Sequence, residues 1–146
     1  MSPNLSNKRV LVFIVAYNAE KTIGGVLRRI PAELRGGNVE VLVIDDSSKD
    51  DTFAAGLAHE KTIEGLKITL LRTPINQGYG GNQKLGYRYA IDHGFDVVAL
   101  VHGDGQYAPE KLPVLLEPFF NENADAVFGS RMINKQDALK GGMPLY

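Results

Sequence analysis

Residues 97–106 read Val-Val-Ala-Leu-Val-His-Gly-Asp-Gly-Gln, an apolar run that ends in a carboxylate between two glycines. Residues 41–46 have a similar form, Val-Leu-Val-Ile followed by Asp45 and Asp46. Continuous apolar runs of this length are typical of buried strands in a parallel sheet. The carboxyl ends of such strands meet at one edge, where open α/β sheets bind ligands. We therefore expect both acidic clusters at one ligand-binding edge, because stability alone does not explain buried carboxylates.

The rest of the chain alternates between strand and helix patterns. Strands are expected at residues 10–15, 39–44, 67–71, 97–101 and 124–128. Helices are expected after Asn18 as far as Pro31, from Ser47 and Ser48 to about His59, from about Asn82 to His93, and from Pro109 onward. This alternation predicts an α/β fold, a three-layer α/β/α arrangement with a mostly parallel central sheet.

Length and composition limit the class of protein. The 146 residues are enough for one domain, spanning residues 1–146. A net charge of -1 offers no basic surface for nucleic acid, and the absence of cysteine excludes disulfides and thiolate nucleophiles. With neither a signal peptide nor an apolar stretch of about 20 residues, a cytoplasmic location is expected. No complete periodic element follows Arg131, so we expect the N-terminal portion of a longer enzyme, truncated at its C-terminus.

Asp104 is a candidate metal ligand. Its carboxylate is a hard oxygen ligand suited to Mg²⁺ or Mn²⁺, and Gln106 offers a carbonyl oxygen beside it. Such a metal would bridge nucleotide phosphates and neutralise charge on a diphosphate leaving group. The alternative is a turn in which Asp104 caps the helix that begins near Pro109. His102 is either a second metal ligand or a hydrogen-bond donor at the strand end.

The segments after residues 10–15 and 39–44 are candidates for nucleoside binding. The ring of Tyr17 can stack on a base, although a packing role is more frequent, and Asn18 can cap the following helix. One carboxylate of Asp45 and Asp46 can accept a hydrogen bond from a base N–H or a ribose hydroxyl. Alternatively, this acidic cluster forms only a turn and a helix cap.

Residues 76–83, Asn-Gln-Gly-Tyr-Gly-Gly-Asn-Gln, form a glycine-rich stretch that runs into a helix N-terminus. Free backbone N–H groups there would favour a diphosphate, and a flexible connector is an equal alternative. The turn after residues 10–15 lacks the glycine-rich dinucleotide fingerprint, and the chain contains no P-loop pattern. A Rossmann NAD site is therefore disfavoured.

Together these segments resemble the family 2 glycosyltransferases with the GT-A fold, particularly the branch like dolichyl-phosphate mannose synthase. The resemblance covers residues 10 to 131, in the family's order and approximate spacing. The matching segments are Ala16-Tyr17-Asn18, residues 43–52, residues 76–80, Gly103-Asp104-Gly105-Gln106 with Pro109-Glu110, and Gly129-Ser130-Arg131.

The resemblance implies an inverting transfer of sugar from a UDP- or GDP-sugar to an acceptor, with polyprenyl phosphate as a candidate, in cell-wall or glycolipid biosynthesis. The nucleotide-binding residues implied are Ala16, Tyr17, Asn18, Glu20, Asp46, Gly78 and Asp104, with Asp46 on the base. Asp104, the implied catalytic residue, and Gln106 would hold Mg²⁺ or Mn²⁺. Arg131 would face the phosphates or the acceptor. A longer form would associate with the cytoplasmic face of a membrane through its C-terminal part.

Two departures from the family pattern favour another interpretation. The family's metal motif usually begins with an aspartate where this chain has His102, and the chain stops at Tyr146, before the family's C-terminal part. The alternative is a catalytically inactive nucleotide-sugar binding or regulatory module. A receiver-like phosphoacceptor domain would need an acidic cluster after the first strand, where this chain has Ala16-Tyr17-Asn18.

Overall fold

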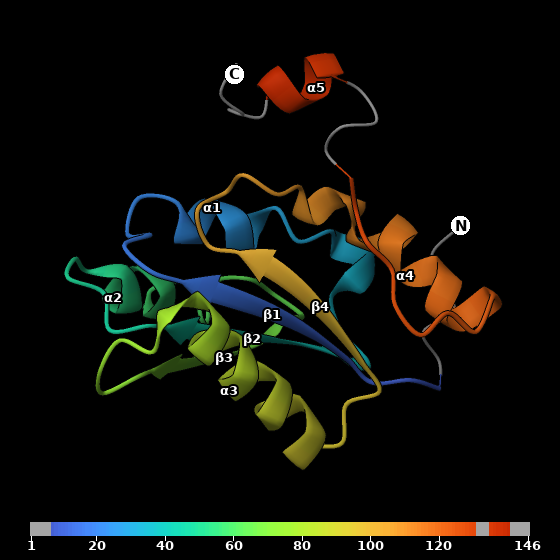
Figure 1. Cartoon of the computed structure of the whole chain (residues 1–146), viewed down its shortest axis with the longest axis horizontal. Coiled ribbons are helices and arrows are strands. Elements are labelled where there is room, and N and C mark those ends of the chain that lie inside the picture. Colours follow the sequence, from blue (N-terminus) through green and yellow to red (C-terminus); the bar gives the residue numbers. More distant parts are fainter. Residues whose placement is uncertain (1–6, 131–134, 141–146) are drawn as a thin grey trace.

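A parallel sheet forms the centre of the computed structural model, which describes residues 7–130 and 135–140 (Figure 1). The sheet has four strands in the order β3-β2-β1-β4, and every neighbouring pair is parallel. The strands are β1 (Val10–Ala16), β2 (Val39–Asp45), β3 (Lys67–Arg72) and β4 (Val97–His102). These are the first four strands expected from the sequence.

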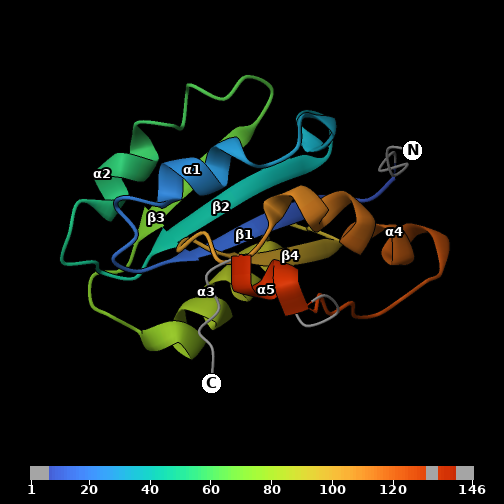
Figure 2. The same ribbon diagram turned by 90° about the horizontal axis from the view of Figure 1, so that it is seen from above.

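Helices cover both faces of the sheet, as the three-layer prediction requires. The helices are α1 (Ile23–Arg28), α2 (Thr52–Leu57), α3 (Gly78–Asp92), α4 (Leu112–Asn121) and α5 (Lys135–Lys140), with 3₁₀ turns η1 (Ala32–Leu34) and η2 (Pro109–Lys111). Seen from above, α1, α2 and α4 lie over the sheet, and α3 packs on the opposite face (Figure 2). The described part of the chain contains no helix with the length and apolar character to cross a membrane.

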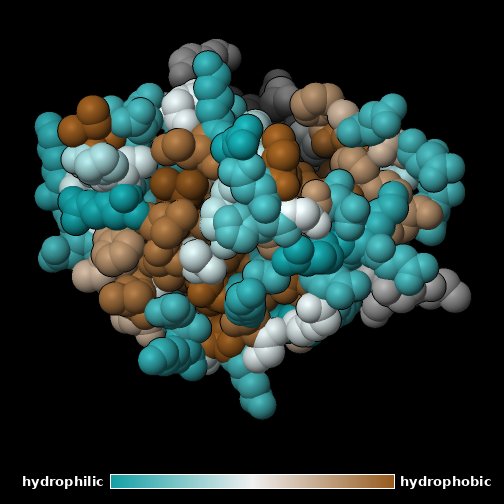
Figure 3. All heavy atoms as spheres, turned by 90° about the horizontal axis from the view of Figure 1, so that it is seen from below, coloured by the Kyte–Doolittle hydropathy of each residue, from teal (hydrophilic) through white to brown (hydrophobic). Residues whose placement is uncertain are grey.

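β1 lies at the centre because it carries apolar side chains on both faces. All residues of Val10–Ala16 are buried. Successive side chains of a strand point to opposite faces. Val12 and Ile14 therefore join the core under α1, while Leu11 and Phe13 join the core under α3. Because α3 alone covers much of the second face, hydrophobic side chains remain at the surface there (Figure 3).

Three helices begin at other residues than expected. α1 begins at Ile23, although its predicted apolar stripe of Ile23, Val26, Leu27 and Ile30 is buried as expected. α2 begins at Thr52 rather than after Ser48, and α3 begins at Gly78 rather than at Asn82. Neither Asn18 nor Ser48 caps a helix, because both side chains bond across loops instead. The prediction that Asn18 caps a helix was therefore wrong, as was the helix start expected at Ser47 and Ser48.

The fifth strand expected at residues 124–128 is also wrong. The backbone there has no regular structure, and Phe128 is 92% exposed. The chain turns at Asn123, which has a φ of 54°, and the Ala124 N–H donates to the Pro118 carbonyl of α4. This segment is therefore bound to the helix end, and among the described strands β4 pairs with β1 alone.

Gly86 sets how closely α3 approaches the sheet. A Cβ added to Gly86 would lie 2.1 Å from the Phe13 ring, well inside contact distance. Phe13 is fully buried in β1, so its ring has little room to move away. A glycine at this position thus allows the central strand and the helix to pack together.

We expect Gly86→Ala to lower the free energy of unfolding by about 1–3 kcal/mol, the usual cost of overpacking a core. Urea denaturation checks this. The control is Gly25→Ala in α1, where an added Cβ meets no atom within 4 Å. That change should leave stability equal or raise it by about 0.5–1 kcal/mol. Equal losses in the two variants would show that close packing is not the reason for Gly86.

Candidate active site

The loops after β1, β2 and β4 meet at the carboxyl edge of the sheet, as the sequence predicts. Ala16 pairs with Asp45 across β1 and β2, and Val15 pairs with His102 across β1 and β4. An open cleft of about 360 Å³ lies beside these strand ends. It is lined by Val15, Ala16, Tyr17, Asp46, Asn76, Gly78, Tyr79, Asn82, His102, Gly103 and Asp104. Its volume suits a small-molecule ligand.

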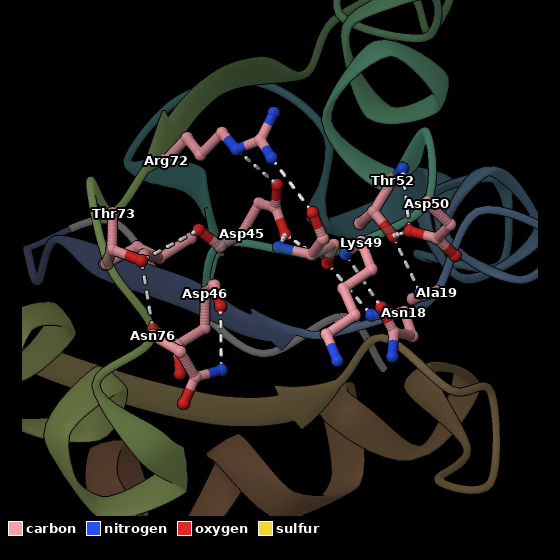
Figure 4. Close-up of polar contacts among 12 residues, drawn as sticks. Asn18, Ala19, Asp45, Asp46, Lys49, Asp50, Thr52, Arg72, Thr73 and Asn76 are labelled. Atoms are coloured by element: carbon pink, nitrogen blue, oxygen red, sulfur yellow. Dashed lines mark hydrogen bonds and ion pairs between the residues drawn. The ribbon is translucent and has the colours of Figure 1, made fainter.

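Asp45 holds the loop after β2 and does not line the cleft. Its side chain is 1% exposed, and its Oδ1 accepts hydrogen bonds from the Ser48 N–H at 3.1 Å and from the Ser48 hydroxyl. Its Oδ2 lies 3.4 Å from Arg72 Nε, and Arg72 Nη2 donates to the Ser48 carbonyl at 2.9 Å (Figure 4). For Asp45 the turn interpretation is therefore the correct one.

Asp46 lies in the wall of the cleft and is held rigidly. Its Oδ1 accepts hydrogen bonds from Thr73 Oγ1 at 3.0 Å and from the Gln77 N–H at 2.8 Å. Asn76 Nδ2 donates to the Asp46 carbonyl at 2.9 Å (Figure 4). The Asp46 N–H donates to the Ala16 carbonyl. A carboxylate at 3% exposure with these donors has a defined position. Sequence reasoning named Asp46 and the 76–83 stretch separately, but it missed Thr73 and the contact between Asn76 and Asp46.

Hydrogen bonds join the loop after β1 to the loop after β2. The Asn18 N–H donates to Ser48 Oγ at 2.9 Å, and Asn18 Oδ1 accepts from the Lys49 N–H at 3.0 Å. The Glu20 N–H donates to Asp50 Oδ2 at 3.2 Å. Burial would raise the pKa of Asp50, but hydrogen bonds from Thr52 and Glu20 lower it below its usual value. Asp50 is therefore an ionised acceptor at neutral pH.

Only some of the nucleotide-binding candidates reach the cleft. Ala16, Gly78 and Tyr17 line it, and Tyr17 is 48% exposed. Asn18 and Glu20 lie outside its lining, and Arg131 lies outside the described residues.

The glycine-rich stretch begins helix α3. The Gln77 N–H donates to Asp46, and the Gly78 N–H donates to Asn76 Oδ1 at 3.0 Å. These two N–H groups are therefore not free for a diphosphate. The alternative of a flexible connector is wrong from Gly78 onward, because these residues belong to α3. Binding of a diphosphate at this helix start stays a prediction.

Asn82 is a cleft residue within the 76–83 stretch, but sequence reasoning gave its side chain no role of its own. It is 2% exposed, and its Nδ2 donates to the Ile44 carbonyl at the end of β2 at 3.0 Å. Within the described part of the chain, its Oδ1 has no hydrogen-bond partner. Asn82 shares the buried side of α3 with Gly86 and Ala90, and that four-residue spacing was the available sequence signal.

Asp104 lines the cleft from the loop after β4, and its side chain is exposed. Its Oδ1 accepts the Gln106 N–H at 3.0 Å, so Asp104 stabilises its own turn. It does not cap the following helix, because Ala108 occupies the N-cap of η2. Gly103 packs on β1, where a Cβ would lie 3.2 Å from the Val15 carbonyl oxygen. Gln106 is exposed and lies outside the cleft lining.

His102 contacts two tyrosines at the mouth of the cleft. Its Nε2 lies 2.7 Å from the Tyr79 hydroxyl, and the rings of Tyr79 and Tyr107 meet its ring edge-on at 5.0 and 4.6 Å. Burial raises the pKa of Tyr79, so the phenol stays protonated at neutral pH. The imidazole Nε2 is thus engaged in a hydrogen bond with Tyr79, and the tautomer of His102 decides which of the two groups donates. The donor role expected of His102 stays a prediction.

The described residues contain no cluster of three or more His, Asp or Glu side chains that would enclose a metal ion. Mg²⁺ is usually held by one or two carboxylates together with substrate phosphates and water. Asp104 fits that pattern, because it presents one exposed carboxylate to a cleft large enough for a phosphorylated ligand. The donor set therefore suits a metal that arrives with a diphosphate.

Comparison with known proteins identifies relatives among glycosyltransferases. Residues 11–144 match the model described as Glycosyl transferase family 2. A UDP-N-acetylglucosamine–dolichyl-phosphate N-acetylglucosaminyltransferase of Methanococcus voltae is 27% identical over 91% of this chain and 56% of its own length. An undecaprenyl-phosphate mannosyltransferase of Micrococcus luteus is 34% identical over 86% of this chain and 49% of its own length. The chain spans about half the length of these curated relatives.

Solved structures share the fold. A Pyrobaculum calidifontis mannosyltransferase in complex with GDP-Man and Mn²⁺ superimposes with a TM-score of 0.63 at 23% identity, covering 76% of this chain and 32% of the other. Glucosyl-3-phosphoglycerate synthase of Mycobacterium tuberculosis, in complex with Mn²⁺, UDP and phosphoglyceric acid, gives a TM-score of 0.60 at 23% identity, covering 80% and 40%. The predicted GT-A type of α/β fold is confirmed.

We expect Ser48→Ala to destabilise the protein, because it removes one hydrogen bond to the buried Asp45 and the acceptor for the Asn18 N–H. The loss in unfolding free energy should be about 1–3 kcal/mol, as for a buried polar group left without a partner. Urea denaturation at neutral pH measures it. The matched control is Thr62→Ala, whose hydroxyl bonds the His59 carbonyl at the surface and should change stability by less than about 0.5 kcal/mol. A similar small change in both variants would contradict the structural role of Ser48.

Proposed function

The chain belongs to glycosyl transferase family 2, and from this premise we propose that it forms the donor-binding part of an inverting sugar transferase. The donor would be a nucleoside-diphosphate sugar, either a UDP- or a GDP-sugar. One observation carries the proposal: a rigidly held Asp46 and an exposed Asp104, from loops far apart in the sequence, line the same cleft. If either carboxylate had only a packing role, the two would not need to line the same cleft.

We assign the nucleoside to the side of the cleft formed by Tyr17 and Asp46. The half-exposed ring of Tyr17 offers an aromatic face for the base, and the fixed carboxylate of Asp46 offers an acceptor for a base N–H or ribose hydroxyl. Ala16 and Gly78 complete this wall. Asn18 and Glu20 support nucleotide binding indirectly, because their contacts hold the loop that carries Tyr17.

We assign the diphosphate to the side of the cleft formed by Asp104. A Mg²⁺ or Mn²⁺ ion held there supplies positive charge that stabilises the leaving diphosphate. Asp104 provides the protein ligand, and the Gln106 N–H fixes one of its oxygens. Gln106 acts in this assignment through its backbone, since its side chain lies outside the cleft lining.

A polyprenyl phosphate is the acceptor class we propose. The relatives from Methanococcus voltae and Micrococcus luteus are named for transfer to dolichyl and undecaprenyl phosphate. An acceptor phosphate is already ionised and needs little help from a general base. In the whole protein we place this reaction at the cytoplasmic face of a membrane, where such an acceptor is embedded.

A second candidate is a nucleotide-sugar binding module without turnover. The contact that favours it is the hydrogen bond between His102 Nε2 and Tyr79, at the position where the family usually has an aspartate. Incubation of the chain with UDP- and GDP-sugars, with and without a polyprenyl phosphate, separates the two. Donor hydrolysis or transfer supports the enzyme, and binding without either supports the module.

Calorimetry with UDP and GDP, each with and without Mn²⁺, tests the proposal. We expect one nucleotide to bind about tenfold more tightly with Mn²⁺, which corresponds to about 1.4 kcal/mol. Asp104→Asn should abolish this gain and leave metal-free binding nearly unchanged, because the nucleoside wall is intact. The control is Asp92→Asn, an exposed carboxylate at the end of α3 and outside the cleft lining. Failure of the unmodified chain to bind either nucleotide would refute the proposed function.

A further inference from the structure

Arg29 binds the loop that carries Asp104 through three contacts. Its Nε lies 2.5 Å from Glu110 Oε1, its Nη2 lies 3.0 Å from Glu110 Oε2, and its Nη1 donates to the Gly105 carbonyl at 3.1 Å. The guanidinium therefore binds the turn after β4, at Gly105, and helix η2, at Glu110, at the same time. A bidentate arginine–carboxylate pair fixes the relative orientation of its two side chains better than a single contact does.

The N-cap residue of α1, Thr22, holds the same loop on the other side of Asp104. Thr22 Oγ1 donates to the Gly103 carbonyl at 2.7 Å. Gly103 and Gly105 are the two neighbours of Asp104, so both flanking carbonyls are bound by residues at the ends of α1. α1 is a firm support because Ile23, Val26 and Leu27 anchor it in the core.

Local structure alone leaves the position of Asp104 open. Glycines on both sides give this backbone wide conformational freedom, and Gly105 has a φ of 79°. The Asp104 bond to the Gln106 N–H shapes the turn but does not fix the turn relative to β1 and the cleft. The Gly103 N–H donates to the Val15 carbonyl at 2.9 Å and ties the start of the turn to β1. The contacts from Thr22 and Arg29, at the two ends of α1, hold the carbonyls on both sides of Asp104.

The salt bridge between Arg29 and Glu110 is better explained by a role in positioning the 103–106 turn than by a contribution to the stability of the fold. Their side chains are 38% and 49% exposed, and ion pairs at such exposure contribute little to the free energy of folding. The hydrogen bond from Arg29 lowers the pKa of Glu110 below its usual value, so the pair is ionised at neutral pH. Neither residue lines the cleft, so neither is placed to contact a ligand there directly.

We propose that Arg29 and Glu110 are positioning residues that hold the 103–106 turn so that Asp104 faces the cleft. This inference rests on the proposed function for its consequence, the binding of a metal with a nucleoside diphosphate. A site with one protein carboxylate is sensitive to the placement of that carboxylate. The pair should therefore affect metal-dependent nucleotide binding without affecting the nucleoside wall.

Two measurements on Glu110→Gln and Arg29→Gln test the proposal. Hydrogen exchange at the amides of residues 103–106 should become about fivefold faster or more, because the turn opens locally. The dissociation constant for GDP or UDP in the presence of Mn²⁺ should rise about tenfold, as for loss of a group that supports a metal ligand. Without metal, nucleotide affinity should stay within about twofold of the unmodified chain, since a shift smaller than that is below about 0.4 kcal/mol.

Arg29→Lys and Asp92→Asn are the companion variants. Lysine keeps the charge but cannot contact Glu110 with two nitrogens and Gly105 with a third, so we expect partial recovery of Mn²⁺-dependent binding relative to Arg29→Gln. Asp92 forms a comparable surface pair with Arg88 at 3.0 Å, so Asp92→Asn should change neither the exchange of residues 103–106 nor the effect of Mn²⁺.

The results separate this inference from the proposed function. If the unmodified chain binds no nucleotide, the proposed function fails, and the exchange rates alone decide whether the pair holds the turn. Unchanged exchange in Glu110→Gln overturns the inference in either case. Equal weakening of nucleotide binding with and without Mn²⁺, or a lower unfolding midpoint as the sole effect, also overturns it, because both indicate a general structural role.

Discussion

Parallel pairing of β1 with both β2 and β4 is the constraint on which the site depends. The pairing sends the three loops that follow these strands to the same edge of the sheet. Because β1 is buried on both faces, a shift of register by one residue would exchange its two faces and misplace its side chains. The position of Asp46 relative to Asp104 is thus a consequence of strand pairing in the core.

Hydrogen bonds between loops then make the cleft rigid. Asp45 and Asp46 are neighbours in sequence and both are buried, yet they face different partners. Asp45 binds Ser48 and lies near Arg72, whereas Asp46 accepts from Thr73 and lines the cleft. One acidic cluster therefore provides both the support of a loop and a candidate ligand group. A preorganised wall of this kind lowers the ordering cost of binding.

The errors of prediction share one cause. Apolar runs such as residues 10–16 form strands for local reasons, and the first four were found where their patterns lie. Asn18 looks like a helix cap because only its near neighbours are visible in the sequence, but its partner is Lys49. Residues 124–128 have a strand-like composition, but a strand needs a hydrogen-bonded partner, and none of the described strands pairs with them.

By itself the sequence determined the α/β class, the four strands β1 to β4 and the edge at which Asp46 and Asp104 meet, because buried strands have continuous apolar runs and parallel strands share one carboxyl edge. Only the tertiary structure decided which residues serve each carboxylate. It separated Asp45 from Asp46, brought Asn82 into the cleft, and joined Arg29 to Glu110 across the molecule. A hydrogen bond forms only when donor and acceptor lie about 3 Å apart. Whether two residues far apart in the sequence come that close depends on how their helices and strands pack, and the spacing of residues along the chain does not reveal it.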